Sequence, residues 1–163
     1  MSGKPEKQAT KGDGDVATNR KARHAYAIEQ TWEAGLALRG SEVKSLRAAA
    51  VTIGDGFVIE DGGELWLMNV HVNEYAQANQ HNHEPMRKRK LLLHRSEIEA
   101  ITKQIQERGR TCVPLRFYFE RGLAKVEIAT CVGKKLHDKR ESLKEKDAKR
   151  DMDRARQGRG DDD

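Results

Sequence analysis

The 163-residue sequence lacks any apolar run long enough to cross a lipid bilayer, and its first 19 residues contain no apolar segment of the kind a secretory signal requires. These absences exclude a helical membrane protein and predict a cytoplasmic location. Cysteine is also scarce, because Cys112 and Cys131 stand alone in two strand-like segments. The sequence therefore predicts two reduced, buried thiols that serve as small apolar residues, rather than a disulfide or a thiolate metal site.

Patterns typical of enzymes are absent as well. The six histidines are not spaced with the cysteines as zinc ligands would be, and we interpret His81-Asn82-His83, in a polar stretch, as solvated. Gly133-Lys134 resembles the end of a phosphate-binding loop, but Ile128 stands where that loop requires its first glycine. No serine or cysteine occupies a nucleophile elbow. We predict a protein that is not an enzyme and holds no cofactor and no metal ion; a hydrolase or nuclease is the weaker alternative.

Charge is abundant, since Asp, Glu, Lys and Arg make up 35% of the residues, and the net charge is +5. The whole excess lies at the two ends. Residues 1–25 carry 6 basic and 3 acidic side chains, residues 26–132 carry 14 of each, and residues 133–163 carry 11 and 9. Basic ends on a neutral body favour a polyanionic partner, most often a nucleic acid. Termini whose charge only keeps the protein in solution are the alternative, and composition does not separate the two.

Hydrophobic periodicity predicts five or six strands. Near-alternating apolar residues indicate a long strand over 26–38, with a bend at Gly35, and two hairpins over 57–72 and 111–132. The turns of these hairpins are predicted at Asp61-Gly62-Gly63 and Arg121-Gly122. A polar stretch over 73–90 is interpreted as a long loop, a feature that is usually functional or mobile.

Two helices are expected between the strands. Ser41 is the predicted N-cap of a short helix that runs to about residue 50. Ser96 and Glu99 form a predicted capping box for a second helix, which Gly109 ends and whose buried stripe is Ile98, Ile101 and Ile105. Because strands and helices do not alternate as βαβ units, the predicted fold is mainly β with helices: a small closed antiparallel OB-type β-barrel with flanking helices.

Three segments are expected along the chain: a disordered N-terminal arm over 1–19, the barrel over 20–132, and a basic C-terminal tail over 133–163. In the tail the large apolar residues up to Gln157 are Leu136, Leu143 and Met152, too few for a packed face, while opposite charges recur at helical spacing. We predict a tail that is disordered when free and helical when bound to an anionic partner. A solubilising extension is the alternative.

Arg87-Lys88-Arg89-Lys90 places four positive charges in a row, next to an apolar segment. Such a run is usually a solvated face. Four adjacent cations held on a folded surface repel one another unless an anion neutralises them, so we favour contact with RNA.

Four stretches together resemble one protein family. They are "NRKARHAYAIEQTWEAGLALRGSEVKSLRA" (19–48), "RKRKLLLH" (87–94), "VPLRFYF" (113–119) and "GKKLHDKR" (133–140). In this order and at these intervals they resemble the SsrA-binding protein family, also called the SmpB family. The resemblance implies a non-enzymatic protein with an OB-type barrel. It implies binding to the tRNA-like domain of tmRNA, support of its charging with alanine, and its delivery with elongation factor Tu to stalled ribosomes for trans-translation, which rescues the ribosome and tags the incomplete protein for degradation.

The resemblance also implies two sets of site residues. The tmRNA-binding set comprises Tyr26, Glu33, Glu42, Arg47, Arg87, Lys90, Leu92 and His94. The tail set, which faces the ribosomal decoding centre and the mRNA channel and becomes helical there, comprises Gly133, Lys134, Lys135, His137, Asp138, Lys139 and Arg140. Lysines and arginines would neutralise phosphates, aromatic and apolar side chains would contact a base or ribose, and Glu33 would orient a cation or accept a hydrogen bond.

The chain departs from the family pattern at Ala49-Ala50, where a Gly-Lys is common, at Glu84, where an Asp is usual, and in the final Asp161-Asp162-Asp163. The runner-up function is that of another OB-type RNA-binding factor associated with the ribosome, with the tail as a generic basic arm.

Overall fold

The computed structural model describes residues 14–134 and 136–157, with the side chains of residues 79, 136–143 and 156–157 outside the description. The chain divides into two compact units, Met1–Val132 and Gly133–Asp163. The second contains helix α4 (Leu136–Gln157), whose described side chains, those of residues 144–155, are all exposed. None of the described helices is long and apolar enough to cross a bilayer.

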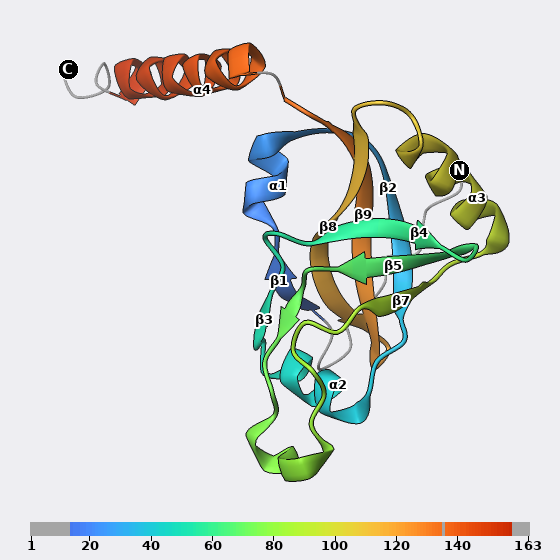
Figure 1. Ribbon diagram of the computed structural model, residues 1–163. Coiled ribbons are helices and arrows are strands. Elements are labelled where there is room, and N and C mark those ends of the chain that lie inside the picture. The colour runs from blue at the N-terminus through green and yellow to red at the C-terminus, as the bar shows by residue number, and fades with distance from the viewer. Residues whose placement is uncertain (1–13, 135, 158–163) are drawn as a thin grey trace, which may run out of the picture. The chain divides into compact units, whose positions relative to one another are not determined.

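The first unit is built mainly of strands (Figure 1). The strands are β1 (Gly14–Thr18), β2 (Tyr26–Leu36), β3 (Val51–Thr52), β4 (Phe57–Asp61), β5 (Glu64–Met68), β6 (His71–Val72), β7 (Arg89–Leu92), β8 (Arg110–Glu120) and β9 (Leu123–Gly133). The helices are α1 (Arg20–Ala25), α2 (Gly40–Arg47), the 3₁₀ helix η1 (Ala76–His81) and α3 (Arg95–Ile105).

Seven of the strands form one sheet, in the order β1-β8-β9-β2-β7-β5-β4, and β3 pairs with β6 in a second, two-stranded sheet. The pairings for which the register is defined are antiparallel. The fold is therefore mainly β and antiparallel, as the periodicity predicts. The order does not return to its first strand, although β4 packs against β8. A closed OB-type barrel is accordingly not confirmed.

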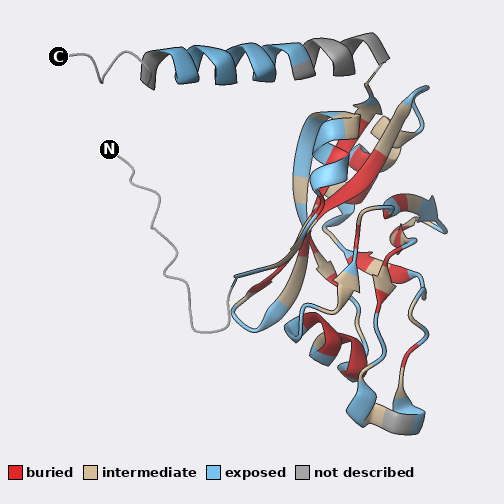
Figure 2. Ribbon diagram, turned by 90° about the vertical axis from the view of Figure 1, so that its left-hand side faces the viewer, coloured by how far each residue is buried: buried red, intermediate tan, exposed pale blue. Residues whose placement is uncertain are grey.

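The main core is formed by one face of the sheet, and alternate side chains of β5 and β7 are buried in it (Figure 2). Leu65 and Leu67 of β5 and Leu91 of β7 are fully buried there, and α3 covers them with Ile98 and Ile101 of the predicted stripe. Each such side chain stabilises the fold by about 1.5–3 kcal/mol relative to an exposed position.

The β8–β9 hairpin is buried on both faces. A register shift between Pro114 and Arg116 places Phe117 in the main core, while Leu115 packs with Ala129 in a second cluster beneath α1. The predicted alternation along β8 is thus interrupted by this bulge. Its turn lies at the predicted Arg121-Gly122, where both residues have positive φ, as the turn of a two-residue hairpin requires.

The N-terminal arm was predicted to extend to residue 19, which is wrong for its last residues. Residues 14–18 form β1, which pairs with β8, and Val16 and Ala17 pack against the main core. Asn19 is buried and caps α1 by accepting a hydrogen bond from the Ala22 backbone, 3.0 Å. Two small apolar residues in a polar stretch are too weak a pattern to predict this strand.

Both predicted serine caps are also wrong. Arg39 is the N-cap of α2, so Ser41 lies inside the helix, and His94 is the N-cap of α3. Ser41 instead bonds to His83, which is buried rather than solvated, with 2.9 Å between Oγ and Nδ1. The His83 Nε2 donates to the Val72 carbonyl at 2.9 Å, because a carbonyl oxygen can only accept.

The stretch over 73–90 is more ordered than a simple loop. It contains η1 and the start of β7, and hydrogen bonds tie it to α2 and to the residues that follow α2. The Ser45 hydroxyl donates to the Asn73 carbonyl at 2.6 Å, and the Asn73 backbone donates to the Ala50 carbonyl at 2.9 Å. These bonds, with the Ser41–His83 pair, fix the segment against the helix.

Candidate RNA-binding surface

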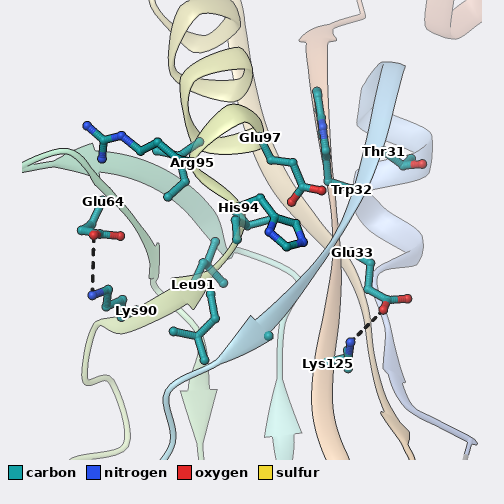
Figure 3. Close-up of a pocket in the computed structure, with 14 residues that line it drawn as sticks. Thr31, Trp32, Glu33, Glu64, Lys90, Leu91, His94, Arg95, Glu97 and Lys125 are labelled. Atoms are coloured by element: carbon teal, nitrogen blue, oxygen red, sulfur yellow. Dashed lines mark hydrogen bonds and ion pairs between the residues drawn. The ribbon is translucent and has the colours of Figure 1, made fainter.

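An open groove of about 840 Å³ lies where β2 and β7 meet the beginning of α3 (Figure 3). Its lining includes Glu33 on β2, Lys90 and Leu92 on β7, His94 at the start of α3 and Lys125 on β9. Four of these five residues belong to the tmRNA-binding set implied by the sequence resemblance. The fold thus brings them together from segments that are far apart in the chain.

The groove owes its shape to the pairing of β2 with β7. Gly35 lies directly opposite Leu92 in this pairing, and a Cβ at Gly35 would be 3.2 Å from the Leu92 Cβ. Because glycine leaves this space free, Leu92 lies over the β2 backbone with 51% of its surface exposed, while its neighbour Leu91 is buried. An exposed leucine in a polar groove offers a contact surface for a flat apolar group such as a base.

Two ion pairs, each between neighbouring strands, lie along the groove (Figure 3). The Lys125 Nζ lies 2.9 Å from the Glu33 Oε1, and the Lys90 Nζ lies 3.7 Å from the Glu64 Oε1. All four side chains are partly exposed, and ion pairs of this kind contribute only about 0–1 kcal/mol. A phosphate can therefore replace either carboxylate at low cost. Burial and the hydrogen bond with Glu33 both raise the pKa of Tyr118, so this phenol stays protonated and holds the carboxylate in place.

The sequence resemblance did not point to Lys125. Alternation along β9 offered the only signal, because Val126 and Ile128 face the core and Lys125 therefore faces outward. Trp32 and Arg95 also line the groove and were not predicted.

The other four members of the set lie outside the groove lining. Tyr26, at the start of β2, packs against the second apolar cluster. Arg47 lies on α2 with its guanidinium 4.8 Å from the centre of the Phe119 ring. Arg87 and Glu42 belong to a buried cluster between α2 and β7.

Glu42 is fully buried and forms ion pairs with both Arg87 and Arg89. It also accepts a hydrogen bond from the Arg39 backbone at 3.0 Å. Burial raises the pKa of this carboxyl, but the bonds from Arg39, Arg87 and Arg89 outweigh burial and lower it overall. The Glu42 side chain has no surface exposed to solvent. In this structure the contacts of Glu42 are with the two arginines and the Arg39 backbone.

The interpretation of the 87–90 run as four surface cations needs correction. Arg89 is only 1% exposed, and it also donates to the Val70 and Pro85 carbonyls at 2.8 and 3.0 Å. Each cation of the run has an acidic partner. Arg87 and Arg89 pair with Glu42, Lys88 lies 3.7 Å from Asp61, and Lys90 pairs with Glu64. Carboxylates of the protein thus neutralise these cations, a role that the sequence interpretation gave to RNA.

The tail set is described only in part. Gly133, at the end of β9, is exposed, and Lys134 is half-buried. Lys135 lies outside the described residues. His137, Asp138, Lys139 and Arg140 lie in α4 by their backbone, with their side chains outside the description.

Both cysteines are free and fully buried, as predicted. Burial, with a smaller contribution from Glu29, raises the pKa of Cys131 to about 11, and burial raises the pKa of Cys112 further. Both thiols are therefore protonated at neutral pH.

Comparison with known proteins gives a consistent result. The family model described as "SmpB protein" matches residues 16–158. The chain is similar to the SsrA-binding protein of Thermobifida fusca (strain YX), with 51% identity over 155 residues, covering 95% of this chain and 97% of that protein. It is likewise similar to the SsrA-binding protein of Geobacillus thermodenitrificans (strain NG80-2), with 50% identity over 146 residues, 89% of this chain and 94% of that protein.

A solved structure, described as "tmRNA-SmpB: a journey to the center of the bacterial ribosome", contains a similar chain. The TM-score is 0.65 and the sequence identity is 44%, over 78% of this chain and 93% of that chain. A family match over most of the sequence, relatives at about half identity and a similar fold agree with one another. The chain belongs to the SmpB family of SsrA-binding proteins.

Proposed function

We propose that this protein binds the tRNA-like domain of tmRNA and delivers it, charged with alanine, to stalled ribosomes for trans-translation. The observation that carries the proposal is the family match over residues 16–158 together with the groove that gathers Glu33, Lys90, Leu92 and His94. The function is one of binding, with no catalysed reaction. Elongation factor Tu with the charged tmRNA and the small-subunit rRNA are the further partners, and the cytoplasm is the location.

The groove residues make different kinds of contact with the RNA. Lys90 and Lys125 exchange their carboxylate partners for phosphates, which fixes the position of the RNA. Leu92 and His94 contact an unpaired base or a ribose, because both are exposed on the rim of the groove. Glu33, once released from Lys125, accepts a hydrogen bond from a base amino group or a 2′-hydroxyl.

The remaining members of the set act at the edges of this surface. Arg87 is half-buried, and Glu42 holds its guanidinium at one position, so that it is pre-organised for a phosphate. Tyr26 and Arg47 contact parts of the RNA beyond the groove. The contact between β4 and β8 supports an OB-type arrangement, a fold that commonly presents such a surface to oligonucleotides.

The tail has a separate role. We assign Gly133, Lys134, Lys135, His137, Asp138, Lys139 and Arg140 to the decoding centre and the mRNA channel. The structure describes residues 136–157 as helix α4, and its described side chains, those of residues 144–155, are all exposed. Because a helix without a packed face gains little stability of its own, we propose that the tail is disordered in free solution and that contact with the ribosome stabilises the helix.

A filter-binding comparison tests the proposal. The full chain should bind the acceptor-branch fragment of tmRNA more tightly than an ordinary tRNA of the same length. In the double variant Lys90→Gln and Lys125→Gln, loss of two phosphate contacts should reduce the slope of log K against log salt by roughly 1.4–1.8. The matched control replaces Lys21 and Lys103, two exposed lysines outside the groove, with glutamine. Equal affinity for both RNAs would favour a general RNA-binding factor.

Removal of residues 133–163 tests the division of roles. The shortened chain should keep its affinity for the tmRNA fragment and lose tagging on stalled ribosomes. Circular dichroism of the isolated tail, alone and with decoding-site RNA, should show helix only in the mixture. Parallel loss of RNA binding and tagging would contradict separate roles for the two units.

A further inference from the structure

The outward face of the β4–β5 hairpin carries large apolar side chains. Phe57 lies opposite Met68 and Ile59 lies opposite Trp66, so the four side chains form two adjacent cross-strand pairs. Their neighbours along the strands, such as Leu67, are buried in the core, which places the four on the other side of the sheet. Phe57 is 38% exposed and the other three are partly exposed.

Trp66, at the centre of this face, has a cation beside it. The Lys88 Nζ lies 4.4 Å from the centre of the indole ring. The indole N–H donates to the Asp61 carbonyl at 3.3 Å, which fixes the plane of the ring. A partly exposed aromatic ring in a fixed orientation next to a lysine is the arrangement with which proteins bind bases of single-stranded nucleic acid.

The face is continuous with the groove. Strand β5 lies between β4 and β7 in the sheet (Figure 1). The register of β5 and β7 places Trp66 directly opposite Lys90. Lys90 and Leu92 are two residues apart on β7, so they point to the same side, and both line the groove. One outward surface therefore extends from Leu92 across Lys90 to Trp66 and Phe57.

We propose that this outward face of β4 and β5 is a second RNA contact, at which an unpaired base stacks on Trp66. The inference rests on the proposed function, which it extends from the groove to the neighbouring strands. A base that enters takes the place of Lys88 over the indole, and the freed ammonium meets the phosphate of the same nucleotide. The contact is independent of base identity, because every base presents a flat π surface.

Charge favours RNA over a protein partner on this face. Lys88 and Lys90 lie within it, and each is paired with an exposed or partly exposed acid at 3.7 Å. Phosphates can take over both lysines and leave the carboxylates in water. An apolar protein segment would instead bury four charged groups, and charged residues are depleted from the centres of protein interfaces for this reason.

Fluorescence tests the stacking directly, because the chain contains only two tryptophans, Trp32 and Trp66. In a Trp32→Phe variant all indole emission comes from Trp66. Saturation with the acceptor-branch fragment of tmRNA should quench this emission strongly. A blue shift without quenching, or unchanged emission at saturation, would overturn base stacking, and the blue shift would indicate an apolar covering instead.

Affinity measurements with the full chain complete the test. Trp66→Leu should weaken binding of the fragment by roughly 5- to 150-fold, the range of one stacked base, while Trp66→Phe should retain most of the affinity. Tyr75→Leu, which removes a partly exposed ring outside this face, should bind like wild type. Wild-type affinity in Trp66→Leu would refute the second contact and leave the groove intact as a proposal, whereas failure of wild type to prefer tmRNA would refute the proposed function itself.

Discussion

Substitution of Glu42 by glutamine tests the buried cluster between α2 and β7. Glutamine has nearly the same shape, and its oxygen can still accept the hydrogen bond from the Arg39 backbone. Its amide nitrogen, however, is a donor that would face the Arg89 Nε, which is also a donor. The substitution therefore leaves a fully buried guanidinium without its counter-charge.

The expected loss of stability is large. Removal of one member of a buried ion pair costs about 3–5 kcal/mol, because the remaining charge has lost its partner and stays out of water. Arg89 is 1% exposed, and its hydrogen bonds to two carbonyls do not compensate a full charge. We therefore expect Glu42→Gln to lower the free energy of unfolding by about 3–5 kcal/mol. A domain of this size has a total stability of only about 5–15 kcal/mol, and Glu42→Gln should unfold at a much lower urea concentration.

Urea denaturation at pH 7 measures the change in the free energy of unfolding. The matched control is Glu99→Gln, because Glu99 forms an exposed ion pair with Arg95 at 3.5 Å and should cost no more than about 0.5 kcal/mol. A loss below about 1 kcal/mol in Glu42→Gln would refute the reasoning, since Arg89 would then have found water or another anion.

The pH dependence of the same measurement has a defined sign. The pKa of Glu42 in the folded protein lies below its ordinary value of 4.5, so its contribution is fully present above that pH. The contribution is lost as the pH falls through the folded-state pKa. The stability difference between wild type and Glu42→Gln should consequently shrink below pH 4.5, and a difference that grows on acidification would contradict the assignment.

Three smaller perturbations follow from the packing. In Gly56→Ala the new Cβ would lie 2.8 Å from the Pro114 Cγ, so urea unfolding should show a loss of about 1–3 kcal/mol. In Gly35→Ala the Cβ should displace Leu92 and weaken binding of the tmRNA fragment several-fold, while unfolding changes by less than about 1 kcal/mol; unchanged affinity would argue against Leu92 as a contact. Cys131 should resist iodoacetamide in the native protein at pH 8, where about one thousandth of it is thiolate, and react once urea unfolds the chain.

Periodicity was sufficient to predict the features that depend on local pattern. The two hairpins and the buried stripe of α3 follow from alternation at two residues and from apolar spacing at three and four. The turn at Arg121-Gly122 follows from the need for positive φ. Each of these signals lies within a few neighbouring residues, so no knowledge of the tertiary structure is needed.

The features that periodicity missed depend on partners distant in the sequence. The sequence pattern predicts that Arg89 is a surface cation, because its partner Glu42 lies 47 residues away in the chain and only the tertiary structure brings the two together. The local pattern likewise predicts that Ser41 is a helix cap, whereas in the structure its hydroxyl bonds to the distant His83. The groove itself forms only when β2 and β7 pair, and the resemblance to a family, rather than the pattern, identified four of its residues.

The pairing within the 87–90 run has a consequence for how this sequence can change over generations. The acidic residues that neutralise the run come from α2, β4 and β5. The positions of the run are therefore constrained by different partners, and the four positions do not change together. Replacement of Arg89 by an apolar residue would be tolerated only alongside a matching replacement of Glu42, whereas the exposed pair of Lys88 and Asp61 imposes no such requirement on the stability of the fold. Among descendants of this gene, positions 42 and 89 should therefore covary.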